Sequence, residues 1–357
     1  MKKLLRDILI LAGLLLMGIS TVRPVMGWIS ERRVENDAWW GVHKAVNGDL
    51  VGMAYLDKVP QFHSARDYVF TRHPVETGRN DLYVWGDSYI WKVPDSAYAA
   101  VRYFRFGWRY REDIAYRLND TQNNILLIEV SERYVRQYLA GTDMFRHVYG
   151  AGGDKHPVSR DYTEEREGIN TPGFLNKHIN QNLEFNLFNY NFINPIRHWK
   201  AAMNYHMFRR ASGDVVLSGD GRQLYLRETV AGTNNANSYY PLEDGELEQI
   251  IHTLNALQAH YVAEGFDEVY LSILPNPATI MEPEGYNQLI PLVERHPGLR
   301  MKVISVYDEY HRQTRRIYRP GDTHWNNEGL QIWLRKVNEV LLERQATAPN
   351  RGSRGGA

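Results

Sequence analysis

The chain has 357 residues, 43% of them hydrophobic and 24% charged, a composition typical of a folded globular protein and not of a disordered one. Its 42 basic residues balance its 42 acidic residues, so the sequence lacks the basic excess expected of a protein that binds nucleic acid. It contains no cysteine, which excludes disulfide bonds, thiolate metal sites and a cysteine nucleophile.

The first 27 residues form a candidate targeting segment. Lys2, Lys3 and Arg6 precede an apolar run over residues 8–19, which is the order of charged and apolar residues in a secretory signal. The run is shorter than the roughly 20 residues that span a bilayer comfortably. Residues 1–27 are therefore either a cleaved signal peptide or an uncleaved membrane anchor, with a buried N-terminal helix as the third alternative. Both of the first two place the rest of the chain outside the cytoplasm, in the periplasm or at the cell surface.

Regular elements are expected from residue 81 onwards. Residues 28–80 mix charged and aromatic residues without a clean period, and we expect them to pack on the domain as a lead-in segment. Short apolar runs predict buried strands at 81–85 and 124–130. Helical spacing predicts a helix over 95–119, and a further helical stretch follows the second strand through Leu139.

The alternation of strands and helices is interrupted over residues 141–212. Glycine, proline and asparagine residues predict loops there, and a helix is expected over 193–210. The glycine cluster at 150–153 lacks the Gly-Lys-Ser/Thr ending of a phosphate-binding loop. We interpret residues 141–212 as a helical and loop insertion, or cap, over one edge of the sheet.

Strands and helices alternate again in the last third of the chain. The pattern predicts strands at 223–227, 268–274 and 302–307, a helix at 247–263, a final helix capped by Asn326 or Asn327, and a disordered tail over 346–357. Strands separated by helices predict an α/β fold, a three-layer sandwich with a mainly parallel sheet.

Two short motifs stand at strand-to-helix junctions. Gly86-Asp87-Ser88 follows the first expected strand, and Asp322-Thr323-His324-Trp325 lies in the loop before the final helix. Because the chemistry of a parallel sheet sits at the carboxyl ends of its strands, both motifs are expected at the same edge.

These motifs contain the groups that acyl transfer through a serine requires. Ser88 is the candidate nucleophile, His324 the base that takes its proton, and Asp322 the carboxylate that orients the imidazole. The backbone N–H of Ser88, expected at the start of a helix, is a candidate donor to an oxyanion. The structural alternatives are a helix cap for Ser88 and a loop histidine bonded to the backbone for His324.

On these motifs the chain resembles the SGNH/GDSL hydrolase superfamily, and within it the SGNH-like proteins of alginate and related exopolysaccharide O-acetylation. The similarity spans most of residues 80–345 and is carried by the segments 85–88, 128–134, 274–283 and 322–325. It implies an SGNH hydrolase-like domain over residues 28–345, with Ser88 as nucleophile, His324 as base and Asp322 as the partner of the base.

One feature of the chain differs from ordinary GDSL esterases, and another differs from the O-acetylation group. One residue separates Asp322 from His324, as in the O-acetylation group, whereas ordinary GDSL esterases have two. The Asp-x-His-Trp motif follows the Gly-Asp-Ser motif, as in ordinary GDSL enzymes, whereas it precedes that motif in the O-acetylation group. This order indicates a circular permutation within one fold, which termini at the surface allow.

The asparagine that completes the oxyanion hole in GDSL enzymes has no convincing match in this chain. Arg133 and Tyr134 occupy the comparable region, and with Trp325 they are the candidates for binding the oxyanion or the substrate. Arg133 has an alternative role in an ion pair with Glu129 or Glu132, and Trp325 is either a stacking platform for a sugar or a core residue.

Three functions remain open at this point. The first is an extracytoplasmic O-acetyltransferase that acts on a cell-envelope polysaccharide and receives its acyl group from a membrane-bound donor protein. The second is an acyl esterase with water as acceptor, and the third is a noncatalytic polysaccharide-binding protein. The 13 histidines include no His-Glu-x-x-His motif, and neither a metal nor a cofactor is expected.

Overall fold

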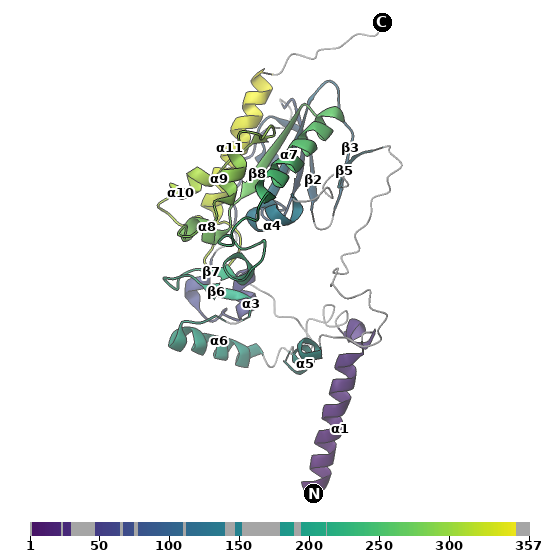
Figure 1. The fold of residues 1–357 in the computed structure, drawn as a ribbon, viewed down its shortest axis with the longest axis vertical. Helices are drawn as coiled ribbons and strands as arrows, with labels where there is room; N and C mark the ends of the chain where they lie inside the picture. Colours follow the sequence, from purple (N-terminus) through teal and green to yellow (C-terminus); the bar gives the residue numbers. More distant parts are fainter. Residues whose placement is uncertain are drawn as a thin grey trace.

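A five-stranded parallel sheet forms the centre of the molecule (Figure 1). The computed structural model describes residues 2–22, 24–29, 47–64, 67–74, 78–109, 112–139, 147–151, 179–188, 194–211 and 213–347. The strand order is β2-β1-β4-β8-β9. The strands are β1 (Asn80–Gly86), β2 (Val101–Trp108), β4 (Asn123–Ser131), β8 (Glu268–Leu274) and β9 (Lys302–Val303).

The three central strands are buried on both faces, which explains their nearly continuous apolar sequences. Every residue of β1 and β4 is buried. Successive side chains point to opposite faces, so Tyr83 and Trp85 enter one core while Leu82 and Val84 enter the other. The chain is therefore an α/β protein with a core on each side of its sheet, which is compatible with the expected three-layer sandwich.

Helices cover both faces of the sheet (Figure 1). The first core packs the sheet against α4 (Glu132–Tyr138), α7 (Glu246–Ala263) and α9 (Leu289–Glu294). The second core packs the opposite face mainly against α11 (Asn327–Thr347), whose Trp333 is fully buried. The short helices α8 (Pro277–Met281) and α10 (Tyr307–His311) lie in the connections between these elements.

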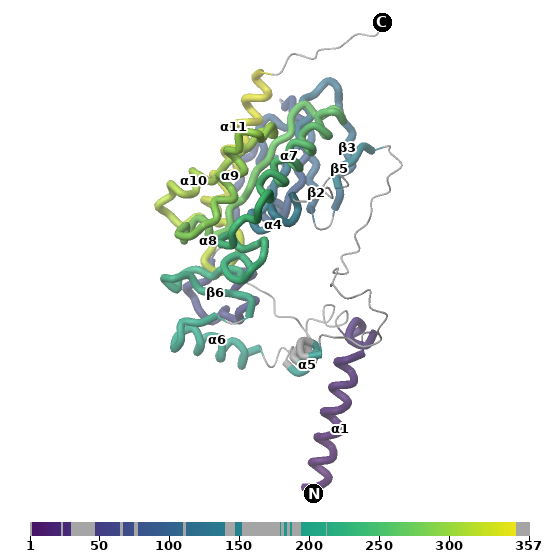
Figure 2. The backbone as a smooth tube through the Cα atoms, in the orientation of Figure 1, coloured from purple at the N-terminus to yellow at the C-terminus, as the bar shows by residue number. Residues whose placement is uncertain are grey.

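A third, smaller core lies beyond one end of the sheet (Figure 2). It joins α3 (Asp49–Ala54) and α6 (Asn194–Phe208) to the antiparallel hairpin of β6 (Val215–Leu217) and β7 (Leu224–Leu226). The lead-in segment expected before the first strand thus contributes α3 to a packed layer. The remaining elements are α1 (Lys2–Thr21), α5 (Ile179–Phe188), the strand pair β3 (Ile114–Tyr116) and β5 (Val148–Gly150), and the 3-10 helices at Pro60–Phe62, Asp95–Ala97 and Arg227–Thr229.

Most of the predicted elements are confirmed, and three are wrong, one of them the helix expected to start at Ser88. Residues 95–119 hold β2 and β3 and not the expected helix. In β2, an edge strand, Phe104 and Phe106 pack against the second core while Tyr103 lies beside Tyr83 on the other face, so the aromatic residues follow a period of two. The strand expected at 302–307 ends after Val303, and α10 begins at Tyr307.

The predictions for the insertion and the tail are tested in part. Residues 152–178 of the expected insertion lie outside the described residues, whereas α6 confirms the helix expected within it. The final helix extends to Thr347, so the first two residues of the expected tail are helical, and residues 348–357 lie outside the described part of the chain.

The helix α1 contains the apolar run of the N-terminal segment. Among the described helices it is the one whose length and composition allow it to cross a membrane, a test that signal sequences also pass. This is compatible with either alternative, a signal peptide or an anchor, and with a location outside the cytoplasm.

We predict that Gly86→Ala destabilises the fold. A Cβ at this position would lie 2.5 Å from a side-chain carbon of Ile90 and 2.7 Å from Glu129 Oε2, so the surrounding atoms must move. Such overpacking costs about 1–3 kcal/mol, measured as the free energy of unfolding in urea. The control is Gly150→Ala, also in a strand, where the nearest atom is 3.7 Å away and belongs to Tyr116. Equal losses in the two variants would contradict the tight approach at Gly86.

Candidate active site

The candidate site lies at the carboxyl end of β1, where the order of the strands reverses. The next strand in the chain, β2, pairs on one side of β1, and β4 pairs on the other. In open parallel sheets, ligands bind at this kind of switch point. Gly86 ends β1, and Ser88 lies in the turn that follows.

Ser88, His324 and Asp322 are joined by two hydrogen bonds. The Ser88 hydroxyl lies 2.9 Å from Nε2 of His324, and Nδ1 of the same ring lies 2.6 Å from Oδ1 of Asp322. The His324 backbone N–H donates to that same oxygen at 3.1 Å. A carboxylate at Nδ1 favours the tautomer with its proton there, which leaves Nε2 free to accept the proton of the serine.

The carboxyl of Asp322 is held in its charged form. Its side chain is almost fully buried, and burial alone would raise its pKa. The hydrogen bond and charge of His324, helped by the charge of Arg319, outweigh burial and lower the pKa well below its usual value. Asp322 is therefore ionised at neutral pH and can stabilise a protonated imidazole.

Two further carboxyls, those of Asp87 and Glu129, lie close to the turn that carries Ser88. Asp87 accepts hydrogen bonds from the backbone N–H of Tyr89 at 2.9 Å and from the hydroxyl of Ser131 at 2.6 Å, and an ion pair joins it to Arg109 at 3.3 Å. Burial opposes ionisation, but Arg109 and these hydrogen bonds lower the pKa of Asp87. Asp87 thereby ties the turn after β1 to the end of β4.

Glu129 of β4 lies against Asp87, and its pKa is shifted in the opposite direction. Its Oε2 accepts the backbone N–H of Asp87 at 2.7 Å. Complete burial, with the negative charge of Asp87 beside it, raises the pKa of Glu129 well above its usual value. The protonated, neutral form of Glu129 is therefore favoured in the folded protein, and the pair then carries a single negative charge.

The backbone N–H of Ser88 is available to an oxyanion. The N–H groups of Asp87, Tyr89 and Ile90 each donate to an acceptor within the turn or in β4, whereas no acceptor is recorded for that of Ser88 in the described chain. The expected helix after Ser88 is wrong, because residues 88–92 form turns. This N–H therefore acts without a helix dipole, and the helix-cap interpretation of Ser88 no longer applies.

The three other candidate residues occupy different surroundings. Trp325 is fully buried between Tyr89 and Trp333, so its ring offers no surface to a sugar. Tyr134 is half-buried against the first core, with the Arg109 guanidinium 4.9 Å from its ring centre. Trp325 is thus a core residue, the alternative that the sequence left open.

Arg133 is half-buried, and its positive charge helps to lower the pKa of Asp87. Its guanidinium lies 4.9 Å from the centre of the Tyr134 ring. The two glutamates considered as its partners are engaged elsewhere, Glu129 with the Asp87 N–H and Glu132 with the Asn276 N–H. Arg133 thus supplies positive potential near the turn that carries Ser88.

Sequence reasoning missed Asp49, which lies in the first turn of α3. It accepts the backbone N–H of Thr323 at 2.8 Å and the hydroxyl of the same residue, and its Oδ2 lies 3.8 Å from Nδ1 of His324. The backbone N–H of Val51 donates to Gly321 at 3.1 Å, so α3 holds the loop at two points. Asp49 lies 274 residues from Thr323 in a segment without periodicity, and no local signal in the sequence marked it.

Tyr89, next to Ser88, was also missed. Its hydroxyl donates to the carbonyl of Thr323 at 2.6 Å, and its ring centre lies 4.9 Å from that of His324. Tyr89 therefore joins the turn after β1 directly to the loop that carries the base.

One group of side chains in the described chain has the composition of a cation site. Ligand atoms of Asp49, Asp322 and His324 all lie within 4.8 Å of one another. A cation held by Nδ1 of His324 would replace the hydrogen bond between this nitrogen and Asp322. The same residues therefore serve either a cation or a base for Ser88, and not both at once.

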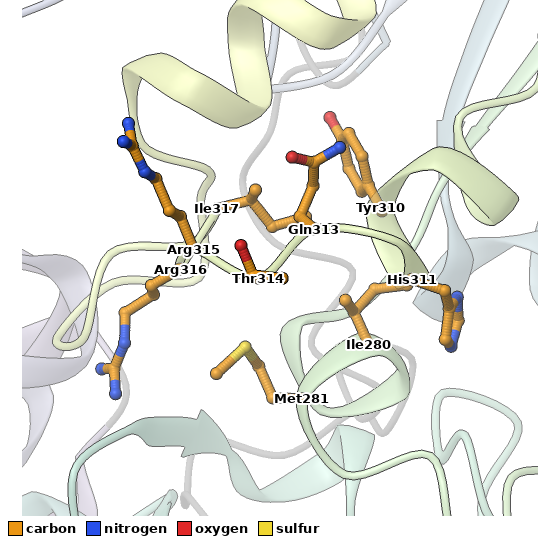
Figure 3. A pocket seen from close by; sticks show the side chains of 9 residues that line it. All are labelled: Ile280, Met281, Tyr310, His311, Gln313, Thr314, Arg315, Arg316 and Ile317. Atoms are coloured by element: carbon orange, nitrogen blue, oxygen red, sulfur yellow. The ribbon is translucent and has the colours of Figure 1, made fainter.

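A separate hollow of about 370 Å³ lies beside the segment 310–317, which leads into the loop (Figure 3). The side chains of Thr314 and Met281 face each other in it, and Arg316 is held by hydrogen bonds to the Arg222 carbonyl and to Gln223. Ser88, Asp322 and His324 are not among the residues that line it.

No family model, curated protein or solved structure matches this chain. What the site can do is therefore argued from its geometry. A hydroxyl hydrogen-bonded to an imidazole, which is in turn bonded to a buried carboxylate, is suited to nucleophilic attack and proton transfer.

We predict that the neutral state of Glu129 makes the fold less stable as pH rises. Because the pKa of Glu129 is raised on folding, the native state keeps a proton that the unfolded state loses. The free energy of unfolding then falls as pH rises above the ordinary range for glutamate, near 4.5, until the raised pKa is reached.

The variant Glu129→Gln tests this expectation, because glutamine mimics the protonated acid in shape and hydrogen bonding. We expect a gain in unfolding free energy over the wild type that grows between pH 5 and pH 8, measured by urea unfolding. Glu264→Gln is the control, at a carboxylate that bonds Tyr116 away from the site. A pH-independent difference would show that Glu129 is ionised in the folded protein.

Proposed function

We propose that the chain is a serine-dependent O-acetyltransferase that acts outside the cytoplasm on a cell-envelope polysaccharide or an exopolysaccharide. The observation that carries the proposal is the pair of hydrogen bonds joining Ser88 to His324 and His324 to Asp322, at 2.9 and 2.6 Å. The polysaccharide supplies the accepting hydroxyl, and a membrane-bound protein supplies the acyl group.

In the first half of the reaction, Ser88 Oγ attacks the carbonyl carbon of the acyl donor while Nε2 of His324 takes the hydroxyl proton. Asp322 stabilises the imidazolium that results, and the N–H of Ser88 donates to the oxyanion. The tetrahedral intermediate collapses, the bond to the donor breaks, and the donor leaves with the proton from His324. The acyl group is then an ester of Ser88.

In the second half, Nε2 of His324 removes the proton of a sugar hydroxyl, and the sugar oxygen attacks the acyl-serine. The ester bond to Ser88 breaks, and Ser88 recovers its proton from the imidazolium. Water in place of the sugar would give acetate, which is the esterase reaction. The two reactions use the same residues and differ in how well the bound acceptor excludes water.

The fold also fits the SGNH/GDSL resemblance that suggested this chemistry. The Gly-Asp-Ser motif begins at the last residue of the buried strand β1, and the Asp-x-His motif lies in the loop just before α11. The apolar N-terminal helix supports a location outside the cytoplasm, in the periplasm or at the cell surface. A noncatalytic polysaccharide-binding protein would have no need of the intact nucleophile and base.

We predict that Ser88→Ala and His324→Ala abolish the release of p-nitrophenol from p-nitrophenyl acetate, and that Asp322→Asn lowers the rate by about 10⁴-fold because the imidazole loses its orienting partner. Mass spectrometry of the quenched wild-type enzyme should find acetyl on the peptide that contains Ser88. Ser96→Ala is the control serine. A variant of Ser88 or His324 with near-normal turnover and an unchanged melting temperature would show that this residue is not catalytic.

The acceptor is tested by adding an acetyl-free oligosaccharide to the same assay. Acetylated sugar, formed at the expense of free acetate, supports transfer, and acetate alone at every acceptor concentration supports the esterase. A chelator added to both assays should leave the rates unchanged, because the proposed steps use only side chains and the backbone.

We predict that Asp49 positions the loop of the base through hydrogen bonds. Asp49→Asn keeps an oxygen that can accept the Thr323 N–H and should change kcat little, whereas Asp49→Ala should lower kcat by roughly tenfold to 100-fold with KM unchanged. Asp57→Ala, in the same lead-in segment, is the control for general loosening. Equal effects of the two Asp49 variants would show that its charge matters and not the position that it holds.

A further inference from the structure

The helix α6 presents an apolar stripe to its surroundings. Ile196, Trp199 and Met207 are 64%, 66% and 67% exposed, and Met203 lies between the last two at helical spacing. Phe208, which ends the helix, is 57% exposed. A continuous row of large, exposed apolar side chains along one helix marks a surface that binds a protein or a membrane.

The opposite side of α6 is already occupied. Ala201 and Tyr205 are buried in the third core, and Nδ1 of His198 donates a hydrogen bond to the Tyr55 carbonyl at 2.9 Å. The helix therefore has a fixed orientation on the protein, and its apolar stripe points away from the body.

The charged residues of the helix all have one sign. Residues 194–211 contain Arg197, Lys200, Arg209 and Arg210 and no acidic residue. Lys200, Arg209 and Arg210 are exposed. An apolar stripe with a tryptophan and a phenylalanine, flanked only by basic residues, has the composition of helices that lie in the interface of an anionic bilayer.

The chain also ties α6 to the end of the membrane-spanning candidate α1. Ser20, near the end of α1, is fully buried and accepts hydrogen bonds from Asn182 and Asn186 of α5, at 2.8 Å on its carbonyl and 2.9 Å on its hydroxyl. Phe188 ends α5 and Asn194 begins α6, so six residue steps, at most roughly 22 Å of extended chain, join the two helices.

Figure 1 places α6 and α5 at the same end of the molecule, the end from which α1 projects. Lys2, Lys3 and Arg6 at the start of α1 favour a cytoplasmic N-terminus. The end of α1 at Ser20, with α5 packed on it, then lies at the outer surface of the membrane, and α6 follows α5 in the chain. The packing of α1 on α5 also favours an anchor over a peptide that is removed.

We propose that α1 remains as a membrane anchor and that α6 lies on the outer surface of the same bilayer. Ile196, Trp199, Met207 and Phe208 enter the boundary between headgroups and acyl chains, and Lys200 and Arg210 contact anionic headgroups. The guanidinium of Arg209 instead donates to the Tyr205 hydroxyl at 3.0 Å, on the side of the third core. This docking does not rest on the chemistry of Ser88.

The natural absence of cysteine allows a direct test with single labels. Trp199→Cys and Met207→Cys are made in the full chain, labelled with an environment-sensitive fluorophore and reconstituted in vesicles of phosphatidylcholine and phosphatidylglycerol. Leu342→Cys is the control, because this residue is 51% exposed on α11 at the far end of the body (Figure 1). The quenchers are a nitroxide on the lipid acyl chain and iodide in the aqueous phase.

We expect the lipid nitroxide to quench labels at 199 and 207 several-fold more than the label at 342, and iodide to show the reverse order. Replacing Lys200 and Arg210 together by glutamate should reduce lipid quenching at 207, as should omitting phosphatidylglycerol. N-terminal sequencing of the membrane-extracted protein should begin within the first residues of the chain.

Three results would overturn the proposal. Labels at 199 and 207 that respond to both quenchers as the label at 342 does would exclude contact with the bilayer. Shielding from iodide that needs a second membrane protein, without quenching by lipid, would assign the stripe to a protein partner. An N-terminus beyond Ser20 would exclude the anchor. Each readout is independent of acyl transfer, so Ser88→Ala protein serves equally well.

Discussion

The hydrogen bond between Ser88 and His324 is the contact on which the interpretation of this molecule depends. It joins side chains 236 residues apart, and in the proposed mechanism neither acts without the other. The sheet makes the contact possible, because β1 delivers Ser88 to the same edge at which the loop before α11 delivers His324. The second hydrogen bond, from the imidazole to Asp322, matters as much, since it decides which ring nitrogen faces the serine.

The geometry of this contact is supported by polar groups on both sides. Beneath the serine, Asp87 and Glu129 share one charge and fasten the turn to β4, and a charge on both would be costly at that depth. Around the histidine, Asp49 and Tyr89 fix the backbone of Thr323 from two directions. Such supporting bonds hold reacting groups within the few tenths of an ångström that proton transfer demands. The site is thus organised before any substrate arrives.

The sequence predicted what is encoded locally. The central strands are buried on both faces, so their apolar runs were unambiguous, and the helices α7 and α11 show a clear period. The edge strand β2 was mistaken for a helix because one of its faces is half-exposed and its mixture of arginine and aromatic residues fits either period. Asp49 was invisible for a different reason: its role depends on the packing of α3 against a loop at the other end of the chain, and no spacing in the sequence expresses that.

The third core gives a physical reason for an active site at this end of the sheet. It packs α6, with its apolar outer stripe, against α3, which carries Asp49 and holds the loop of the base. A helix that rests on a bilayer would therefore set the position of the catalytic edge relative to the membrane. In the proposed reaction, an acyl group from a membrane-bound donor and a polysaccharide outside the membrane must meet at Ser88. An enzyme free in solution would meet such a donor only by diffusion, whereas one anchored by α1 and oriented by α6 would stay close to it, at a higher effective concentration.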